Sequence, residues 1–171
     1  MIVQEGDSPK KTKEKWVHEA IEQYRGGRYE ETLASCEQAL RLKNNYSRAH
    51  HGKGLALMGL EHYEEAVTSL EQAIRLSRQD GVDLDHLAKM YVDQGRALCA
   101  MNRYKEALRV YQEAVRLVPT DKKIQAEKDT VLFELGKAYE QAEAQKARER
   151  AEARKAQRES NWLCEEPFRY E

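Results

Sequence analysis

The fold is decided by one stretch of the chain, residues 91–119, which reads YVDQGRALCAMNRYKEALRVYQEAVRLVP. On either side of residues 101–103 its apolar residues recur every three or four positions, which is the spacing of an amphipathic helix. A connection of so few residues requires the two helices to lie side by side and antiparallel. This stretch therefore predicts a helical hairpin.

The hairpin is one unit of an internal repeat. Residues 28–32 (RYEET) and 62–66 (HYEEA) resemble residues 103–107 (RYKEA), and a similar apolar pattern follows each phrase. The tyrosines of the three phrases follow one another at intervals of 34 and 41 residues. Because one hairpin alone cannot bury its apolar face, the sequence predicts an all-α, right-handed solenoid of helix-turn-helix repeats with a shared core.

The second interval is longer by about two helical turns, so the apolar residues keep their faces. Asp80 and Gly81 are typical of a turn, and Asp83 is typical of a helix N-cap. We therefore expect the added residues to lengthen the helices on both sides of this turn.

The pattern resembles the tetratricopeptide repeat family, whose signature has the form W-x2-L-G-x2-Y, then A-x3-F, then P. The third unit is the best match, with Tyr91, Gly95, Leu98, Ala107, Tyr111, Ala114 and Pro119. The second unit matches through Gly54, Leu57, Ala66, Leu70 and Ala73, with His50 in place of Trp. The first unit matches through Trp16, Ala20, Cys36 and Ala39, whereas Glu19 and Thr32 depart from the signature. Close approach of paired helices is expected at the small residues Ala20, Gly54 and Gly95.

Composition excludes several classes of function. Lys and Arg number 29 and Asp and Glu number 30, so the chain lacks the basic field of a protein that coats nucleic acid. No apolar run has the length of a signal peptide or a membrane span, so we expect a cytoplasmic protein without a membrane partner. Cys36, Cys99 and Cys164 lie too far apart in sequence for a metal pair, and we expect free thiols.

The chain divides into four expected regions: a flexible segment (1–12), three repeats (13–121), a capping and projecting helix (122–160) and an aromatic, acidic tail (161–171). Thr120 is the expected cap of the long helix. An apolar stripe covers only the first part of this helix. Its later residues are charged helix formers that bury little, so we expect that part to extend into solvent.

Two features of the carboxyl-terminal third are candidate binding elements. A basic stripe recurs at every fourth residue, with Lys146, Arg150, Arg154 and Arg158. It could bind phosphate, nucleic acid or an acidic partner, but the neighbouring Glu residues and the lack of interleaved aromatics favour a solvated helix. The tail carries Trp162, Leu163, Phe168 and Tyr170. It could dock in its own groove, in a second copy or in a partner, or pack on the long helix.

The family resemblance implies a ligand groove along the first helices of the repeats. The expected groove residues are Val17, Ile21, Tyr24, Arg25, Arg48, His51, Leu55, Met58, Lys89, Val92, Arg96, Cys99, Lys123 and Phe133. An apolar floor with basic edges predicts an apolar and acidic peptide or helix of a partner protein. The alternative for Ile21, Leu55 and Val92 is a place in the core between helices.

One branch of the family holds the acidic tails of heat-shock chaperones with Lys, Asn and Arg side chains. At the matching positions this chain has Val17, Ile21, Gly52, Lys89 and Asp93. Only Lys89 agrees, so the resemblance argues against a chaperone-tail ligand.

No catalytic, metal or cofactor site is predicted. His18-Glu19 resembles the start of a zinc motif, but Glu22 stands where the second His would be required. We therefore expect a protein-interaction adaptor rather than an enzyme. The alternatives are a self-associating subunit whose tail docks in a groove, and an accessory that binds phosphate or nucleic acid through the basic stripe.

Overall fold

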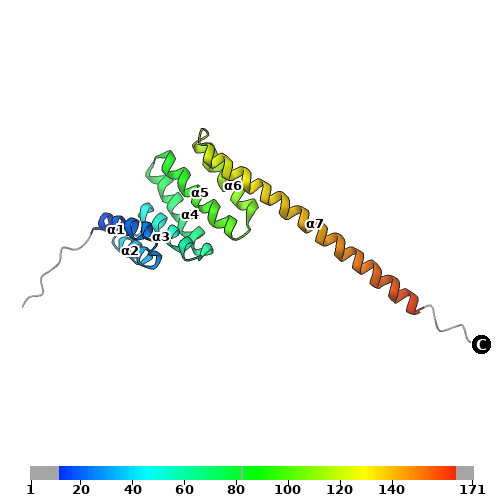
Figure 1. Cartoon of the computed structure of the whole chain (residues 1–171). Coiled ribbons are helices and arrows are strands. Elements are labelled where there is room, and N and C mark those ends of the chain that lie inside the picture. Colours follow the sequence, from blue (N-terminus) through cyan, green and yellow to red (C-terminus); the bar gives the residue numbers. More distant parts are fainter. Residues whose placement is uncertain (1–11, 82, 165–171) are drawn as a thin grey trace, which may run out of the picture. The chain divides into compact units, whose positions relative to one another are not determined.

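The computed structural model describes residues 12–81 and 83–164, and residues 161–164 only by their backbone. Within these residues the secondary structure is entirely helical (Figure 1). The helices are α1 (Lys13–Arg25), α2 (Tyr29–Leu42), α3 (Ser47–Gly59), α4 (Tyr63–Asp80), α5 (Leu84–Ala100), α6 (Tyr104–Leu117) and α7 (Lys122–Cys164). The all-α fold predicted from the repeat is confirmed.

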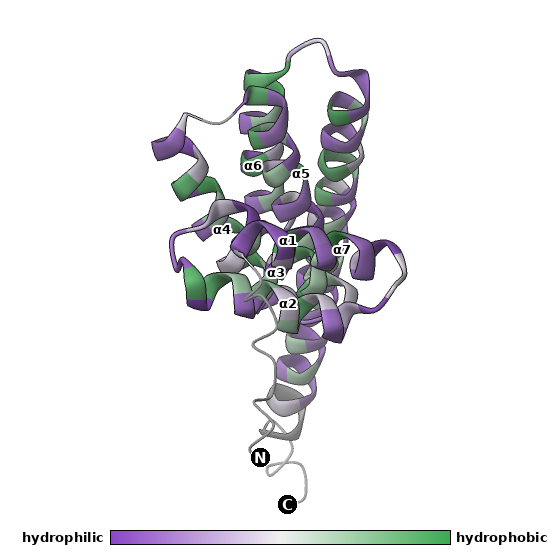
Figure 2. Cartoon of the chain, turned by 90° about the vertical axis from the view of Figure 1, so that its left-hand side faces the viewer, coloured by the Kyte–Doolittle hydropathy of each residue, from purple (hydrophilic) through white to green (hydrophobic). Residues whose placement is uncertain are grey.

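The first six helices form three stacked hairpins. Helices α1 and α2, α3 and α4, and α5 and α6 pack as pairs, and α2 and α4 each pack on the following hairpin. The first helices also contact one another, α1 with α3 and α3 with α5. Hydrophilic and hydrophobic residues alternate around these helices, as amphipathic packing requires (Figure 2).

The paired helices pack closely at Gly54 and Gly95, as predicted. A Cβ atom on Gly54 would lie 2.7 Å from Cγ of Leu70, and one on Gly95 would lie 2.5 Å from Cε2 of Tyr111. Both distances are too short for real atoms, so these two positions require the absence of a side chain. Ala20, the equivalent residue of the first hairpin, is buried.

The added residues of the second interval lengthen two helices, as predicted. Helix α4 has 18 residues where α2 and α6 have 14, and α5 has 17 where α1 and α3 have 13. Gly81 ends α4 in the left-handed conformation with φ of 66°, which glycine adopts without strain. The carboxylate of Asp83 accepts a hydrogen bond from the His86 amide and caps α5.

Helix α7 is capped by Asp121 and not by Thr120. The Asp121 carboxylate accepts hydrogen bonds from the amides of Lys123, at 2.8 Å, and Ile124, at 3.3 Å. It occupies the position directly before the first helical residue, where a side-chain oxygen reaches the free amides of the first turn. The prediction of Thr120 was wrong by one residue.

The chain forms two compact units, and the boundary between them lies within α7, after Val131. The first contains the three hairpins and the start of α7, whose Ile124 and Val131 are buried in the core of the third hairpin. The second consists of α7 from Leu132 onward, and its residues 140–160 are exposed.

The sequence explains why α7 runs on as one helix. Counted from the third repeat, the next turn would fall at residues 142–144, which are Ala-Glu-Ala and favour a helix. Gln145, Arg148 and Glu152 then occupy the places of the Tyr, Ala and aromatic residues of α6. These residues form no apolar face that could pack against the first part of α7, so a second, antiparallel helix is not favoured. The helix continues to Cys164 instead of ending at Ser160.

Candidate functional site

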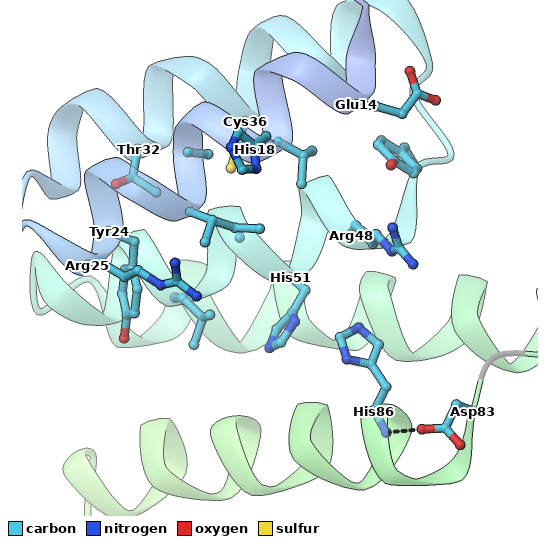
Figure 3. Close-up of a pocket in the computed structure, with 16 residues that line it drawn as sticks. Glu14, His18, Tyr24, Arg25, Thr32, Cys36, Arg48, His51, Asp83 and His86 are labelled. Atoms are coloured by element: carbon cyan, nitrogen blue, oxygen red, sulfur yellow. Dashed lines mark hydrogen bonds between the residues drawn. The ribbon is translucent and has the colours of Figure 1, made fainter.

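A pocket of about 980 Å³ lies between α1, α2, α3 and the start of α5 (Figure 3). Its walls are formed by Glu14, Val17, His18, Ala20, Ile21, Tyr24, Arg25, Thr32, Cys36, Tyr46, Arg48, His51, Gly52, Leu55, Asp83 and His86. All of them belong to the first compact unit. Apolar side chains form most of the pocket surface and charged groups stand at its two ends.

Helix α1 supplies an apolar wall. Val17, Ile21 and Tyr24 are spaced by four and three residues, so they share one face of the helix. Ile21 keeps 44% of its surface exposed, and the Tyr24 ring lies 5.7 Å from the Tyr29 ring of α2. This wall is large, apolar and open to a ligand.

The floor of the pocket lies at Cys36 of α2. This side chain is fully buried, and a Cβ atom on Gly52 would lie only 2.8 Å from its Sγ atom. Burial raises the pKa of the Cys36 thiol to about 12. The thiol is therefore neutral and acts as an apolar surface rather than as a nucleophile.

The polar end of the pocket contains two histidines. Nε2 of His51 lies 2.9 Å from Oδ2 of Asp93, and the His51 and His86 rings meet edge to face at 5.5 Å. Nε2 of His86 is buried and has no hydrogen-bond partner among the described residues. Burial lowers the pKa of His86, and His51, Arg48 and Lys89 lower it further.

Arginines stand at both ends of the pocket (Figure 3). Arg25 pairs with Glu22 at 2.9 Å, one helical turn before it. Arg48 is exposed beside the two histidines and forms no ion pair with another described residue. The pocket can therefore bury apolar groups along α1 and pair an acidic group with Arg48.

The structure brings half of the predicted groove residues together. The pocket is lined by Val17, Ile21, Tyr24, Arg25, Arg48, His51 and Leu55. The other seven lie outside it. Lys89 and Lys123 are exposed, Met58 and Cys99 are half-buried against the core, and Phe133 belongs to the second compact unit.

Two of the predicted groove residues have other roles. Val92 is only 6% exposed and belongs to the core, because α5 is covered by helices on more than one side. Arg96 donates two hydrogen bonds to Glu127 of α7, at 2.6 and 3.1 Å, and a third to Asp93. Its guanidinium is therefore engaged within the protein.

Several pocket residues were not among the predicted groove residues. Asp83 and His86 belong to the lengthened start of α5, which has no counterpart in the first two repeats. Thr32 and Cys36 come from α2, a second helix, whereas the groove was assigned to first helices. The sequence feature that could have identified His86 is the longer interval between the second and third repeats. Residues added at the start of α5 extend this helix toward the preceding repeat.

The basic stripe lies on the exposed part of α7. Lys146, Arg150, Arg154 and Arg158 are all exposed, and Lys146 pairs with Glu143 on the same helix. Trp162 and Leu163 fall in the last residues of α7, and their side chains lie outside the described part of the chain. Phe168 and Tyr170 also lie outside it, as does the predicted amino-terminal segment up to residue 11.

Within residues 12–81 and 83–164, no group of His, Cys, Asp and Glu side chains is arranged to hold a metal ion. Among the described helices, none combines the length and the apolar character that a membrane span needs.

Comparisons with known proteins agree with this architecture. A family model described as a tetratricopeptide repeat matches residues 45–120. No curated protein matches the chain. The fold is similar to the first tetratricopeptide domain of human RPAP3, with a TM-score of 0.66 and 17% identity over 74% of this chain and 94% of that one.

Some of the similar structures are complexes. The second tetratricopeptide domain of human RPAP3, bound to the HSP70 peptide SGPTIEEVD, has a TM-score of 0.60 and 18% identity over 68% of this chain and 91% of that one. The TPR2AB domain of yeast Sti1, in a complex with pHSP90, has a TM-score of 0.67 and 23% identity over 88% of this chain and 59% of that one. The repeats of the sequence, the helical hairpins and these matches agree: residues 45–120 match the tetratricopeptide repeat family, and the described part of the chain has the fold of a tetratricopeptide repeat domain.

Proposed function

We propose that this protein is an adaptor that binds a segment of a partner protein in the pocket between α1, α2, α3 and α5. The observation that carries the proposal is an apolar pocket in which Ile21 and Tyr24 remain exposed. Exposed apolar surface of this kind marks a binding site more often than it serves stability. Burying it contributes about 25 cal/mol per Å² before ordering costs.

The ligand expected in this pocket is apolar with an acidic group. Apolar side chains would pack along the α1 wall, and a carboxylate would pair with Arg48, which forms no ion pair with another described residue. Among the similar structures, one domain is bound to an HSP70 peptide and another is in a complex with pHSP90. One branch of the family holds acidic chaperone tails with Lys, Asn and Arg side chains. At the matching positions this chain has the non-polar residues Val17, Ile21 and Gly52, which favours a more apolar ligand.

The proposal is tested by affinity capture from cells with mass spectrometry, using the wild type and the variants Ile21→Asp and Arg48→Glu. Each variant has a matched control outside the pocket. Leu42→Asp places the same charge at an exposed apolar residue of α2, and Arg109→Glu reverses an exposed charge on α6. We expect a partner that the wild type and both controls retain and that Ile21→Asp loses by about tenfold or more.

Because Ile21 and Arg48 are exposed, their variants are expected to melt like the wild type. Equal recovery of every bound protein by wild type, pocket variants and controls would exclude the pocket as the binding site.

A further inference from the structure

Helix α7 carries the face that the first helix of each repeat uses to pack on its second helix. Gly136 follows Gly95 by 41 residues, the same interval that separates Gly95 from Gly54. Leu132 and Tyr139 stand four residues before and three residues after it, on the same side of the helix. Helix α7 therefore has the glycine notch of a further first helix.

The notch at Gly136 is open. Leu70 fills the space beside Gly54, and Tyr111 fills the space beside Gly95. Apart from the adjoining residues and the backbone of α7 itself, no atom of the described residues lies within 4 Å of the place where a Cβ atom on Gly136 would be. Leu132 is 52% exposed and Tyr139 is 49% exposed, so large apolar side chains border an empty notch.

The described residues that follow Gly136 form no second helix that could pack on this face. Each earlier first helix ends five residues after its small residue, at Arg25, Gly59 and Ala100. Helix α7 instead continues from Gly136 to Cys164 without a turn.

The same stripe of α7 also has the spacing of a second helix. In α6 the residues that face α5 are spaced by three, four and three positions: Tyr104, Ala107, Tyr111 and Ala114. In α7 the same spacing is given by Leu132, Leu135, Tyr139 and Ala142. Tyr139 takes the place of Tyr111, the side chain that fills the notch of Gly95. One helix therefore carries both a notch and the aromatic side chain that fits such a notch.

We infer that α7 pairs with α7 of a second copy of this chain, in antiparallel orientation, with Tyr139 of each copy over Gly136 of the other. Placing residue 139 of one helix opposite residue 136 of its antiparallel partner puts the twofold axis between Lys137 and Ala138. The axis then generates the second contact automatically, as in every interface where both copies use the same patch. The packing repeats that of α5 with α6, which is also antiparallel and places a tyrosine on a glycine.

Sedimentation equilibrium of the full chain from about 5 to about 500 µM tests the inference, because a single helix pair is a small interface and forms a weak dimer. We expect a monomer–dimer equilibrium that Tyr139→Ala weakens by about tenfold or more. Gly136→Leu is expected to weaken the dimer similarly while it raises the helix content, since Leu is a better helix former than Gly. If Gly136→Leu acted only by disrupting α7, dimer affinity and helix content would both fall; the inference expects affinity to fall while helix content rises.

The matched control is Gln141→Leu, which adds the same side chain on another face of α7 and is expected to leave the dimer unchanged. A monomer throughout the concentration range overturns the inference. A dimer that forms equally well in both variants also overturns the inference. If such a dimer disappears only when residues 161–171 are deleted, the tail and not α7 forms the contact.

The orientation is tested separately with a spin label at Ala147→Cys. Cys36 is buried, so a background with Cys99→Ala and Cys164→Ser limits labelling to the new site. At 1.5 Å per residue, antiparallel pairing about residues 137 and 138 places the two labels about 30 Å apart. A separation of about 10 Å, as in parallel pairing, would contradict the proposed register.

Discussion

At the scale of single residues, glycine has opposite roles at equivalent positions of two helices. At Gly95 the Tyr111 ring occupies the space that a side chain would need, whereas the space at Gly136 is empty. The surroundings of each glycine, and not its place in the repeat, therefore decide what a substitution does.

We expect Gly95→Ala to lower the free energy of unfolding by about 1–3 kcal/mol, because the new methyl group forces α5 and α6 apart. Gly136→Ala is the matched control. At low protein concentration it is expected to raise the free energy of unfolding by up to about 1 kcal/mol, through the helix propensity of alanine. Urea denaturation of both variants measures the difference, and equal effects at the two sites would show that the assigned close approach is wrong.

Cys36 is expected to resist alkylation in the folded protein. Burial raises its pKa to about 12, so very little of the Cys36 thiol is ionised near pH 8. Mass spectrometry after a timed treatment with iodoacetamide measures the modified fraction at each cysteine. Modification of Cys36 as fast as that of the half-buried Cys99 would mean that the pocket floor opens in solution.

At the scale of elements, one carboxylate joins the start of α7 to two helices of the third hairpin. Glu127 accepts hydrogen bonds from Arg96 of α5 and from the Tyr111 hydroxyl of α6, the latter at 2.9 Å. Burial opposes ionisation of Glu127, but these two donors outweigh it and hold its pKa below the ordinary value. The carboxylate therefore stabilises the docking of α7 while it is charged.

A double-mutant cycle with Arg96→Ala and Glu127→Ala measures this link. We expect a coupling of roughly 0.5–1 kcal/mol, modest because the Arg96 side chain is 52% exposed and water screens the pair. The coupling is expected to vanish at acidic pH, where Glu127 takes up a proton. A coupling of zero at neutral pH would show that the ion pair does not hold α7.

The contact between Arg96 and Glu127 also decides which arginine can be used to test ligand binding by charge reversal. The family resemblance places Arg96 among the expected groove residues, where a charge reversal would be a natural test of ligand binding. In the structure, Arg96→Glu would place a carboxylate against Glu127 and Asp93. The variant would lose stability, so Arg48 is the suitable residue for testing ligand capture.

At the scale of the whole molecule, two histidines make the stability of the fold depend on pH. Burial lowers the pKa of His50, although its ring donates a hydrogen bond to the Asn44 carbonyl, and burial with nearby positive groups lowers the pKa of His86. Both rings therefore favour the neutral form in the folded state. Protonation is easier in the unfolded chain, which takes up protons first as the pH falls.

We expect the free energy of unfolding to be constant above about pH 7 and to decrease as the pH falls through about 6.5, the ordinary pKa of histidine. The double variant His50→Gln with His86→Gln is expected to flatten this dependence between pH 7.5 and 5.5. Denaturant titrations across this range provide the measurement. A stability that rises on acidification would reverse the assigned sign.

The sequence by itself determined the helices and their pairing. The spacing of apolar residues, the glycines at the helix crossings and the cap at Asp83 act between residues close in the chain, so they can be read without coordinates. The α1 wall of the pocket, with Val17, Ile21 and Tyr24, was expected from the family resemblance, which implies a groove along the first helices of the repeats.

Only the tertiary structure decided which side chains meet across repeats. Arg96 reaches Glu127 and His86 reaches His51, although 31 and 35 residues separate the partners in the chain. Val92 is core rather than groove because neighbouring helices cover α5. Such contacts depend on how one hairpin stacks on the next, and a pattern that records the faces of single helices does not contain that information.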